Sequence, residues 1–125
     1  MNIKEFSEIT GISAHTLRYY EKIGILQEVK RNASGHRNYT ERDIVWAEFI
    51  NRLKETGMPL AQIKEYASLR KRGECTAKTR MNLLEQHALV LKQKITEEQQ
   101  HLKKINEKIQ HYEKLLSNEK PLDLK

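Results

Sequence analysis

The longest regular pattern in the chain lies between Thr76 and Pro121, because no Gly or Pro interrupts that stretch. Within it, one set of positions is separated alternately by four and three residues, and only Glu98 breaks its apolar character. A mean spacing of 3.5 residues is typical of a coiled-coil helix, which at about 40 residues is roughly 60 Å long. The apolar positions of this seam are Leu84, Ala88, Leu91, Ile95, Leu102, Ile105, Ile109, Tyr112 and Leu116.

A helix of this length cannot bury its apolar seam by itself. The chain contains no second helical pattern of comparable length, so the simplest partner is the same helix of another copy. We therefore predict a homodimerisation helix over residues 74–120 and a disordered tail over residues 121–125. The periodicity does not decide whether the two helices run parallel or antiparallel.

The first 73 residues are the more basic part of the chain. They carry 13 Lys or Arg against 9 Asp or Glu, in a protein of 125 residues with a net charge of +6. A basic balance favours an anionic partner such as DNA or a membrane surface, but it does not define sequence specificity. The start of the chain lacks the apolar run of a signal peptide, and no apolar stretch approaches the roughly 18 residues of a membrane span. We therefore expect a cytoplasmic protein with no membrane partner.

Two short helical patterns joined by a glycine-bearing turn open the chain. Residues 3–9 place apolar side chains on one stripe that stops at Gly11, and Ser13 then caps a second helix that ends at Gly24. This arrangement is a candidate helix-turn-helix, whose second helix enters the major groove of DNA. The side chains that we expect to meet bases or phosphates are Ala14, His15, Thr16, Arg18 and Tyr19.

Turn-forming residues cluster between Leu26 and Thr40, where the helical periodicity is lost. This composition predicts a small β-hairpin, or wing. His36, Arg37 and Tyr39 follow the Ser34-Gly35 turn. An arginine on a hairpin tip can enter a narrow minor groove, and a tyrosine can reach a phosphate, so we expect these three residues to bind DNA as well.

Two further helices complete the N-terminal module. Thr40 is a good N-cap with Asp43 placed to bond back to it, and the helix that they begin stops at Gly57. Pro59 fits the first turn of the next helix, which ends by Gly73. We therefore predict a winged helix-turn-helix DNA-binding domain with two accessory helices over residues 1–73.

Three separated segments carry a resemblance to a known family. They are TLRYYEKIGIL at 16–26, SGHRNYTERD at 34–43 and LKETGMPLAQIKE at 53–65, and together they resemble the MerR family of bacterial transcription regulators in identity, order and spacing. The resemblance covers residues 1–120 and is more specific than a lone helix-turn-helix. It implies a mainly α fold, with a winged helix-turn-helix followed by a long dimerisation helix that forms an antiparallel coiled coil.

The resemblance also implies a mode of action. The DNA-contacting positions of the family correspond here to Arg18, Tyr19, Arg37 and Tyr39, with Thr16 and Tyr20 in the same surface or supporting it. Members of the family bind double-stranded promoter DNA as homodimers and distort an overlong spacer, so that RNA polymerase engages both promoter elements. We therefore expect a sequence-specific transcription regulator of this type.

The single cysteine, Cys75, bears on what the protein senses. Metal-sensing members of the family combine a cysteine at this position with cysteines in a loop after the long helix, and those loop ligands are missing here, so no metal site is expected. The sequence is more similar to small members without a ligand-binding domain, among them regulators of aldehyde and thiol-reactive stress. Asn51 stands near the reactive cysteine that some of these carry in their third helix. Cys75 is thus a candidate thiol sensor for an electrophile or another small-molecule effector, and the alternative is an inert residue near the interface.

Two other functions remain open, a nonspecific DNA-bending protein and a coiled-coil scaffold. A nonspecific bender would not need a recognition helix, and a scaffold would not need the DNA-facing groups at 16–21 and 37–39. The sequence has no Ser-His-Asp arrangement, phosphate-binding loop or paired carboxylates, so we expect neither an enzyme nor a cofactor.

Overall fold

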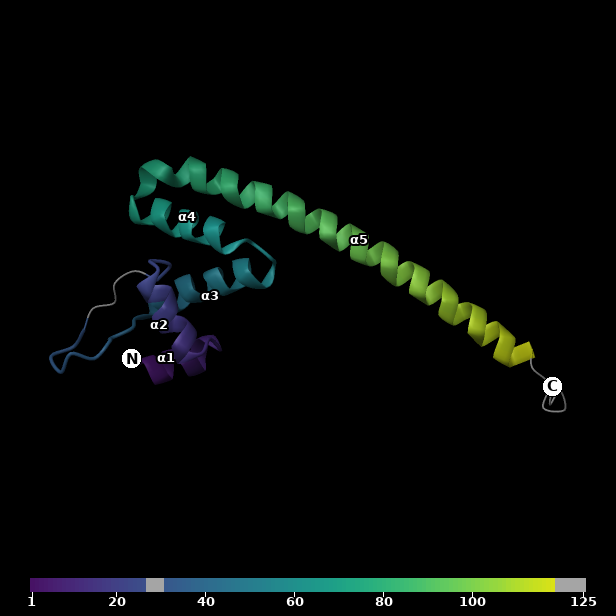
Figure 1. Ribbon diagram of the computed structural model, residues 1–125, viewed down its shortest axis with the longest axis horizontal. Helices are drawn as coiled ribbons and strands as arrows, with labels where there is room; N and C mark the ends of the chain where they lie inside the picture. The colour runs from purple at the N-terminus through teal and green to yellow at the C-terminus, as the bar shows by residue number, and fades with distance from the viewer. Residues whose placement is uncertain (27–30, 119–125) are drawn as a thin grey trace. The chain divides into compact units, whose positions relative to one another are not determined.

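The computed structural model describes residues 1–26 and 31–118, which are mainly α-helical. Five α-helices follow one another along these residues, as Figure 1 shows. They are α1 (Ile3–Thr10), α2 (Ala14–Lys22), α3 (Glu41–Glu55), α4 (Leu60–Lys71) and α5 (Ala77–Asn118), with a short 3₁₀ turn, η1 (Glu74–Thr76), before α5. None of the described helices is long and apolar enough to cross a membrane.

Side chains close the exposed ends of the first three helices, since the first backbone N–H groups of a helix lack partners within it. Asn2 accepts a hydrogen bond from the backbone of Glu5 at the start of α1, at 2.8 Å. Thr40 and Asp43 bond reciprocally at the start of α3, which confirms the predicted capping box. Pro59 lies one position before the predicted first turn, at the N-cap of α4, and no side chain bonds there.

The turn between α1 and α2 depends on Gly11. Its φ of 73° lies in the left-handed region, where a side chain would be strained, and its N–H donates to the carbonyl of Ser7. The chain therefore reverses after α1 and brings α2 against α1, which is the helix-turn-helix predicted from the sequence.

A compact unit extends from Met1 to His87 and has one apolar core. The side chains of Phe6, Leu17, Ile25 and Ile50 are completely buried in it. Helices α1 to α4 supply most of this core, and the first turns of α5 add the half-buried Leu83 and Leu84. The unit therefore includes part of the last helix, beyond the predicted domain end at Gly73.

The start of α5 is also joined to α3 by a polar contact. Nε2 of His87 lies 2.8 Å from Oγ1 of Thr56, the residue that ends α3. His87 lies beside Ala88 of the coiled-coil seam, and it is half-buried. Heptad position alone cannot reveal such a contact, because the partner lies 31 residues earlier in the chain.

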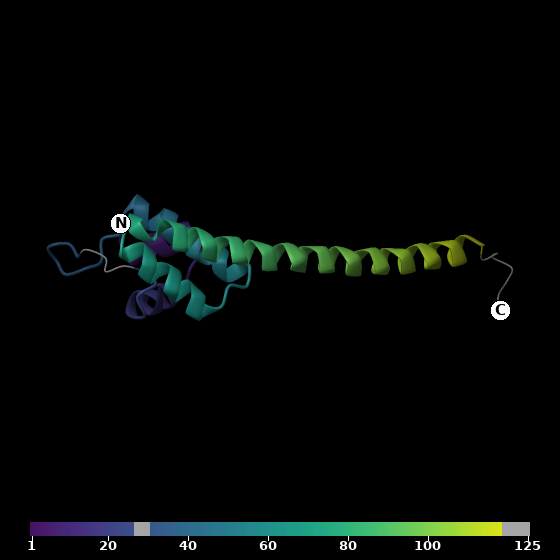
Figure 2. The ribbon, with the colours of Figure 1, turned by 90° about the horizontal axis from the view of Figure 1, so that it is seen from above.

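Residues Ala88–Lys125 form a second unit, whose described part is the remainder of α5. The helix continues without a break to Asn118, as both ribbon views show (Figure 1 and Figure 2). It has 42 residues in all, which confirms the long C-terminal helix expected from the seam. The predicted disordered tail at 121–125 lies outside the described residues.

The predicted wing is described only from residue 31 onward, so its first arm at 27–30 lies outside the described residues. A single antiparallel bridge joins Arg31 to Arg37, and the N–H of Asn32 donates to the carbonyl of His36 at 2.8 Å. Gly35 turns the chain between them with a φ of 79°. Within residues 31–40 the hairpin thus closes through one bridge.

Candidate DNA-binding surface

Helix α2 buries its apolar side and therefore presents a polar face to solvent. Its N-terminus is capped by a side chain. Oγ of Ser13 accepts from the backbone N–H of Thr16 at 3.1 Å and lies 2.9 Å from Oγ1 of the same residue. Leu17 and Tyr20 are buried on the opposite side, with exposed fractions of 0% and 5%. The outward-facing residues form what we call the recognition face: Ala14, His15, Thr16, Arg18 and Tyr19.

The recognition face combines different hydrogen-bonding groups. Arg18 and His15 are exposed, and Tyr19 is 45% exposed although it is aromatic. Ala14 and Thr16 are half-buried near the start of the helix, and the cap holds Thr16 in place. A guanidinium and a phenol in adjacent positions can donate to base edges or to phosphate oxygens. All five residues therefore lie where the sequence placed them, on one accessible helical surface.

An ion pair connects the hairpin to this helix. Nε of Arg37 donates to a carboxylate oxygen of Glu21 at 2.6 Å, and the two side chains are only 25% and 16% exposed. The pair is thus partly shielded from water, where a charge-assisted hydrogen bond is stronger than on an open surface. The contact fixes the returning arm of the hairpin beside the last turn of α2.

Glu21 was not among the residues predicted to be functional. From the sequence it was one acidic side chain on a solvated helical face, and its partner is 16 residues away. Opposite charges at that separation occur in most charged sequences, so no local pattern could have identified the pair. The structure shows that Glu21 pairs with Arg37 and so joins the returning arm of the hairpin to α2.

Tyr39 occupies a different position from the one expected of a phosphate ligand. Its ring is 2% exposed and stacks on Phe6, with ring centroids 4.2 Å apart. Its hydroxyl is buried and has no hydrogen-bond partner among the described residues. Burial raises the pKa of Tyr39 above its ordinary value, and the nearby Glu21 carboxylate raises it further. In this conformation Tyr39 belongs to the apolar core and not to the exposed candidate DNA-binding surface, and the same is true of Tyr20.

The hairpin tip at residues 32–36, between Arg31 and Arg37, is open to solvent. His36 is exposed, and Nη1 of Arg31 donates to the carbonyl of Gly35 at 3.1 Å, which keeps the tip compact. The side chain of Asn32 accepts from the N–H groups of Ser34 and His36. These local bonds hold His36 and Arg37 on the same short loop.

No site for a metal ion accompanies this surface within residues 1–26 and 31–118, where no three His, Cys, Asp or Glu side chains gather. Cys75 is exposed in η1, and its Sγ lies 3.7 Å from the carbonyl oxygen of Arg72. The neighbouring Thr76 is buried, with Oγ1 2.7 Å from the carbonyl oxygens of Leu69 and Gly73. Thr76 therefore anchors η1 to α4.

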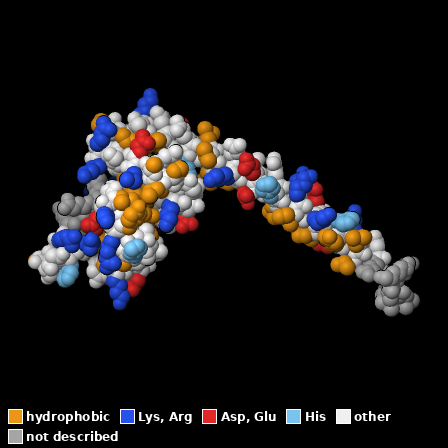
Figure 3. Space-filling view, in the orientation of Figure 1, with side chains coloured by type: hydrophobic (Ala, Val, Ile, Leu, Met, Phe, Trp, Pro, Cys, Tyr) orange, Lys and Arg blue, Asp and Glu red, His pale blue; other side chains and the backbone are white. Residues whose placement is uncertain are grey.

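The apolar seam of α5 is largely uncovered. Figure 3 shows hydrophobic side chains gathered along one side of this helix. The exposed fractions of Ile95, Leu102 and Ile105 are 48%, 57% and 57%, and Ile109, Tyr112 and Leu116 are exposed to a similar degree or more. Leu84 differs, because it packs against the core of its own unit. A row of exposed apolar side chains of this length is typical of an interaction surface.

Known proteins share this sequence and fold. Residues 1–69 match the MerR HTH family regulatory protein family, and residues 46–107 match the family described as MerR, DNA binding. The HTH-type transcriptional regulator AdhR of Bacillus subtilis is 42% identical over 84 residues, which span 67% of this chain and 60% of AdhR. The chain thus spans less than two thirds of that relative.

Solved structures extend the similarity to nearly the whole chain. A MerR family regulator from Listeria monocytogenes aligns with a TM-score of 0.86 and 36% identity, covering 90% of this chain and 86% of that one. HiNmlR, described as a MerR family regulator lacking the sensor domain and bound to promoter DNA, aligns with a TM-score of 0.83 and 34% identity, covering 94% and 93%.

A capped helix-turn-helix with an exposed second helix, a hairpin beside it and a long final helix defines a class of DNA-binding transcription regulators. The chain belongs to the MerR family of helix-turn-helix regulators within that class. This confirms the family resemblance noted in the sequence. It also confirms that the chain is a DNA-binding transcription regulator of this family.

Proposed function

We propose that the protein acts as a homodimer on a promoter spacer, where it distorts the DNA and so controls access of RNA polymerase to both promoter elements. The ion pair between Arg37 and Glu21 is the observation that carries this proposal. It joins the hairpin to α2, so the recognition face and the wing form one continuous surface. Such a surface can follow a major groove and the neighbouring phosphates or minor groove together.

The long helix supplies the second half of the proposal. Its uncovered seam is long enough for a coiled coil with the same helix of another copy, and we propose the antiparallel arrangement implied by the family. Two heads held at a fixed separation by stiff helices can bend and untwist the duplex between two half-sites. The deformation energy is then supplied by phosphate contacts at each head. HiNmlR, which was solved with promoter DNA, supports this assignment.

Titration of the full-length protein against its own upstream DNA, with random competitor, tests the recognition face. If Arg18 touches a base edge, Arg18→Ala should cost on the order of 1 to 3 kcal/mol on the operator and less on random DNA. If Arg18 instead holds a phosphate, the loss should be similar on both. Arg52→Ala, an exposed arginine of α3 outside the recognition face, is the matched control and should leave operator affinity nearly unchanged.

The role of the ion pair has a sharper test. Glu21→Gln removes a negative charge beside the DNA, and electrostatics alone would therefore strengthen binding. If Glu21 positions the wing, the same variant should weaken operator binding instead. Arg37→Ala should weaken binding to specific and random DNA alike and reduce the slope of log affinity against log salt by about one unit per wing.

Two results would contradict the proposal. Unchanged operator affinity in both Arg18→Ala and Arg37→Ala would show that these surfaces do not face DNA, and a coiled-coil scaffold would then be the better explanation. Equal affinity of the unmodified protein for operator and random DNA would favour a nonspecific DNA-bending protein.

A further inference from the structure

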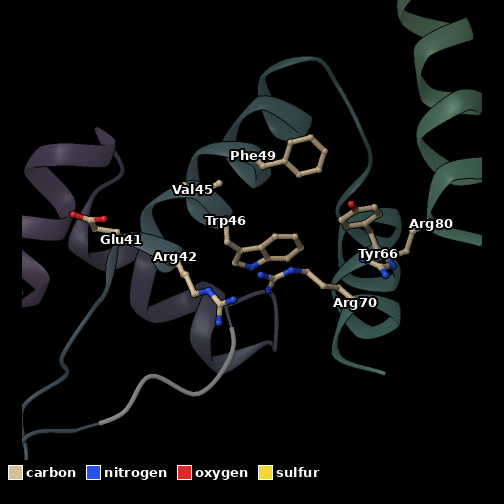
Figure 4. A pocket seen from close by; sticks show the side chains of 8 residues that line it. All are labelled: Glu41, Arg42, Val45, Trp46, Phe49, Tyr66, Arg70 and Arg80. Atoms are coloured by element: carbon tan, nitrogen blue, oxygen red, sulfur yellow. The ribbon is translucent and has the colours of Figure 1, made fainter. Parts of the chain in front are cut away.

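A cavity of about 630 Å³, open to solvent, lies between α3, α4 and the first turns of α5 on the surface of the compact unit, and none of its lining residues belongs to the recognition face. This volume is within the range of roughly 300 to 1,000 Å³ that small-molecule sites occupy. Figure 4 shows Trp46 and Phe49 reaching toward it from α3, Tyr66 and Arg70 from α4, and Arg80 from α5.

The walls of the cavity are aromatic and ordered. Trp46 and Tyr66 are stacked with ring centroids 5.8 Å apart and planes inclined by 15°, and Phe49 lies 5.7 Å from Tyr66. Nε1 of Trp46 donates to the carbonyl of Ile25 at 2.9 Å, which fixes the indole in one orientation. A rigid aromatic wall favours a planar ligand, since little side-chain freedom is lost when the ligand stacks there.

The charge of the cavity is positive. Three arginines line it, Arg42, Arg70 and Arg80, and Glu41 is the only carboxylate among its lining residues. Arg80 is held in place, because Nε donates to Oγ1 of Thr76 at 3.1 Å and Nη2 lies 3.4 Å from the carbonyl of Gly73. The cavity thus presents cations whose positions are set by the fold.

Arg70 is the most informative of the three. Its guanidinium carbon lies 4.0 Å from the ring centroid of Trp46, so a cation–π contact fixes it over the indole. The side chain is half-buried, yet among residues 1–26 and 31–118 it forms no hydrogen bond and has no carboxylate within 4.0 Å. A guanidinium carries five N–H donors in a planar fork that matches a carboxylate, so Arg70 offers charge-assisted hydrogen bonds that no described side chain accepts.

We propose that this cavity binds a small planar aromatic carboxylate, with Arg70 donating to the carboxylate and the ring packing against Phe49 and Tyr66. The aromatic wall alone would accept any flat apolar molecule. The guanidinium of Arg70 favours an anion among such molecules, because its hydrogen bond to a charged acceptor is stronger than its hydrogen bond to a neutral one. None of the residues that line the cavity belongs to the recognition face, and Cys75 is not among them.

The protein carries its own reporter for this site, since Trp46 is its only tryptophan. Benzoate is the probe, added to the full-length protein while the emission of Trp46 and the cross-peak of its indole N–H are recorded. Benzamide tests the need for a negative charge, and cyclohexanecarboxylate tests the need for a flat ring. We expect saturable changes with benzoate, and binding weaker by about tenfold for benzamide, as expected for the loss of one charge-assisted hydrogen bond.

Three variants separate the proposed contact from general electrostatics. Arg70→Gln should weaken benzoate binding by about tenfold or more, and Arg70→Lys should restore part of it as a point charge without the planar fork. Arg72→Gln removes an arginine just beyond the same helix but outside the cavity, and it should bind benzoate like the unmodified protein. Thermal unfolding of each variant checks that the fold is intact.

Three outcomes would overturn the proposal. The first is an unchanged Trp46 signal at saturating benzoate, including the case in which a second copy of the chain fills the cavity in the dimer. The second is equal binding of benzamide and benzoate. The third is an equal loss of benzoate affinity in Arg72→Gln and Arg70→Gln, which would show that only the net charge of the protein matters.

Discussion

Replacing Tyr39 with Phe tests the position of this residue beneath the DNA-binding surface. The hydroxyl is buried and lacks a hydrogen-bond partner among the described residues, whereas the ring stacks on Phe6. Burial of a hydroxyl without compensation costs roughly 1 to 3 kcal/mol in proteins. Tyr39→Phe keeps the ring and removes only that oxygen. We therefore expect the free energy of unfolding to rise by about 1 kcal/mol.

The measurement is urea and thermal unfolding at one fixed protein concentration, because dimerisation links stability to concentration. In a unit of this size, 1 kcal/mol corresponds to roughly 4 to 8 °C in Tm. Tyr19→Phe is the matched control, since Tyr19 is 45% exposed and its hydroxyl is accessible to water. Its stability should change by less than about 0.5 kcal/mol.

The same variant should alter the dependence of stability on pH. The pKa of Tyr39 is raised in the folded protein, mainly by burial, so the fold favours the protonated phenol. This contribution is fully present below the ordinary pKa of 10.0 and is lost as the pH rises through the folded value. The unmodified protein should therefore lose stability above about pH 10 more steeply than Tyr39→Phe.

Two results would refute this account of Tyr39. A loss of 1 kcal/mol or more in Tyr39→Phe would show that the hydroxyl has a partner whose hydrogen bond matters. Unchanged stability together with weaker operator binding would instead show that the hydroxyl reaches a phosphate in the complex. The DNA contact suggested by the sequence would then be correct, and the side chain would have to move on binding.

Three further predictions follow from other parts of the chain. The double variant Leu91→Asp and Ile105→Asp should be monomeric or unstable by sedimentation and bind operator poorly, because charges enter the seam; a stable dimer would exclude this interface. Cys75→Ser should retain operator binding and most of any response to electrophiles in cells, whereas complete loss of induction at unchanged DNA affinity would identify Cys75 as the sensor. Thr40→Ala should lower the free energy of unfolding by about 1 kcal/mol through loss of the capping box, and an unchanged urea midpoint would contradict this.

The pairing of Arg37 with Glu21 changes how the wing should be understood. An isolated arginine on a hairpin tip would act mainly as a mobile cation near phosphate. Here one of its donors is already engaged at 2.6 Å, so the remaining donors of the guanidinium face outward from a fixed position. Such preorganisation lowers the entropic cost of binding DNA, and it makes the acidic Glu21 useful on a surface that binds an anion.

Local patterns in the sequence were sufficient to predict the helices and the residues at which they begin and end. The caps at Ser13 and Thr40, the turn at Gly11 and the uninterrupted helix after Thr76 depend on residues within a few positions of one another. Side-chain oxygens that satisfy the first N–H groups, and glycine in the left-handed region, act over one helical turn. The polar face of α2 follows from the same short-range periodicity.

Only the tertiary structure decided which side chains of those elements are buried or paired across the chain. Tyr39 and Arg37 are two positions apart, yet one enters the core against Phe6 and the other reaches Glu21. Leu84 obeys the heptad spacing but packs into its own unit, and the cavity beside Arg70 combines residues from three helices. These outcomes depend on contacts between segments distant in sequence, and periodicity describes each segment only in isolation. The sequence therefore determines the elements and the family of this protein, while the packing of α1 to α4 against the start of α5 determines which residues lie on the surface and which form the core.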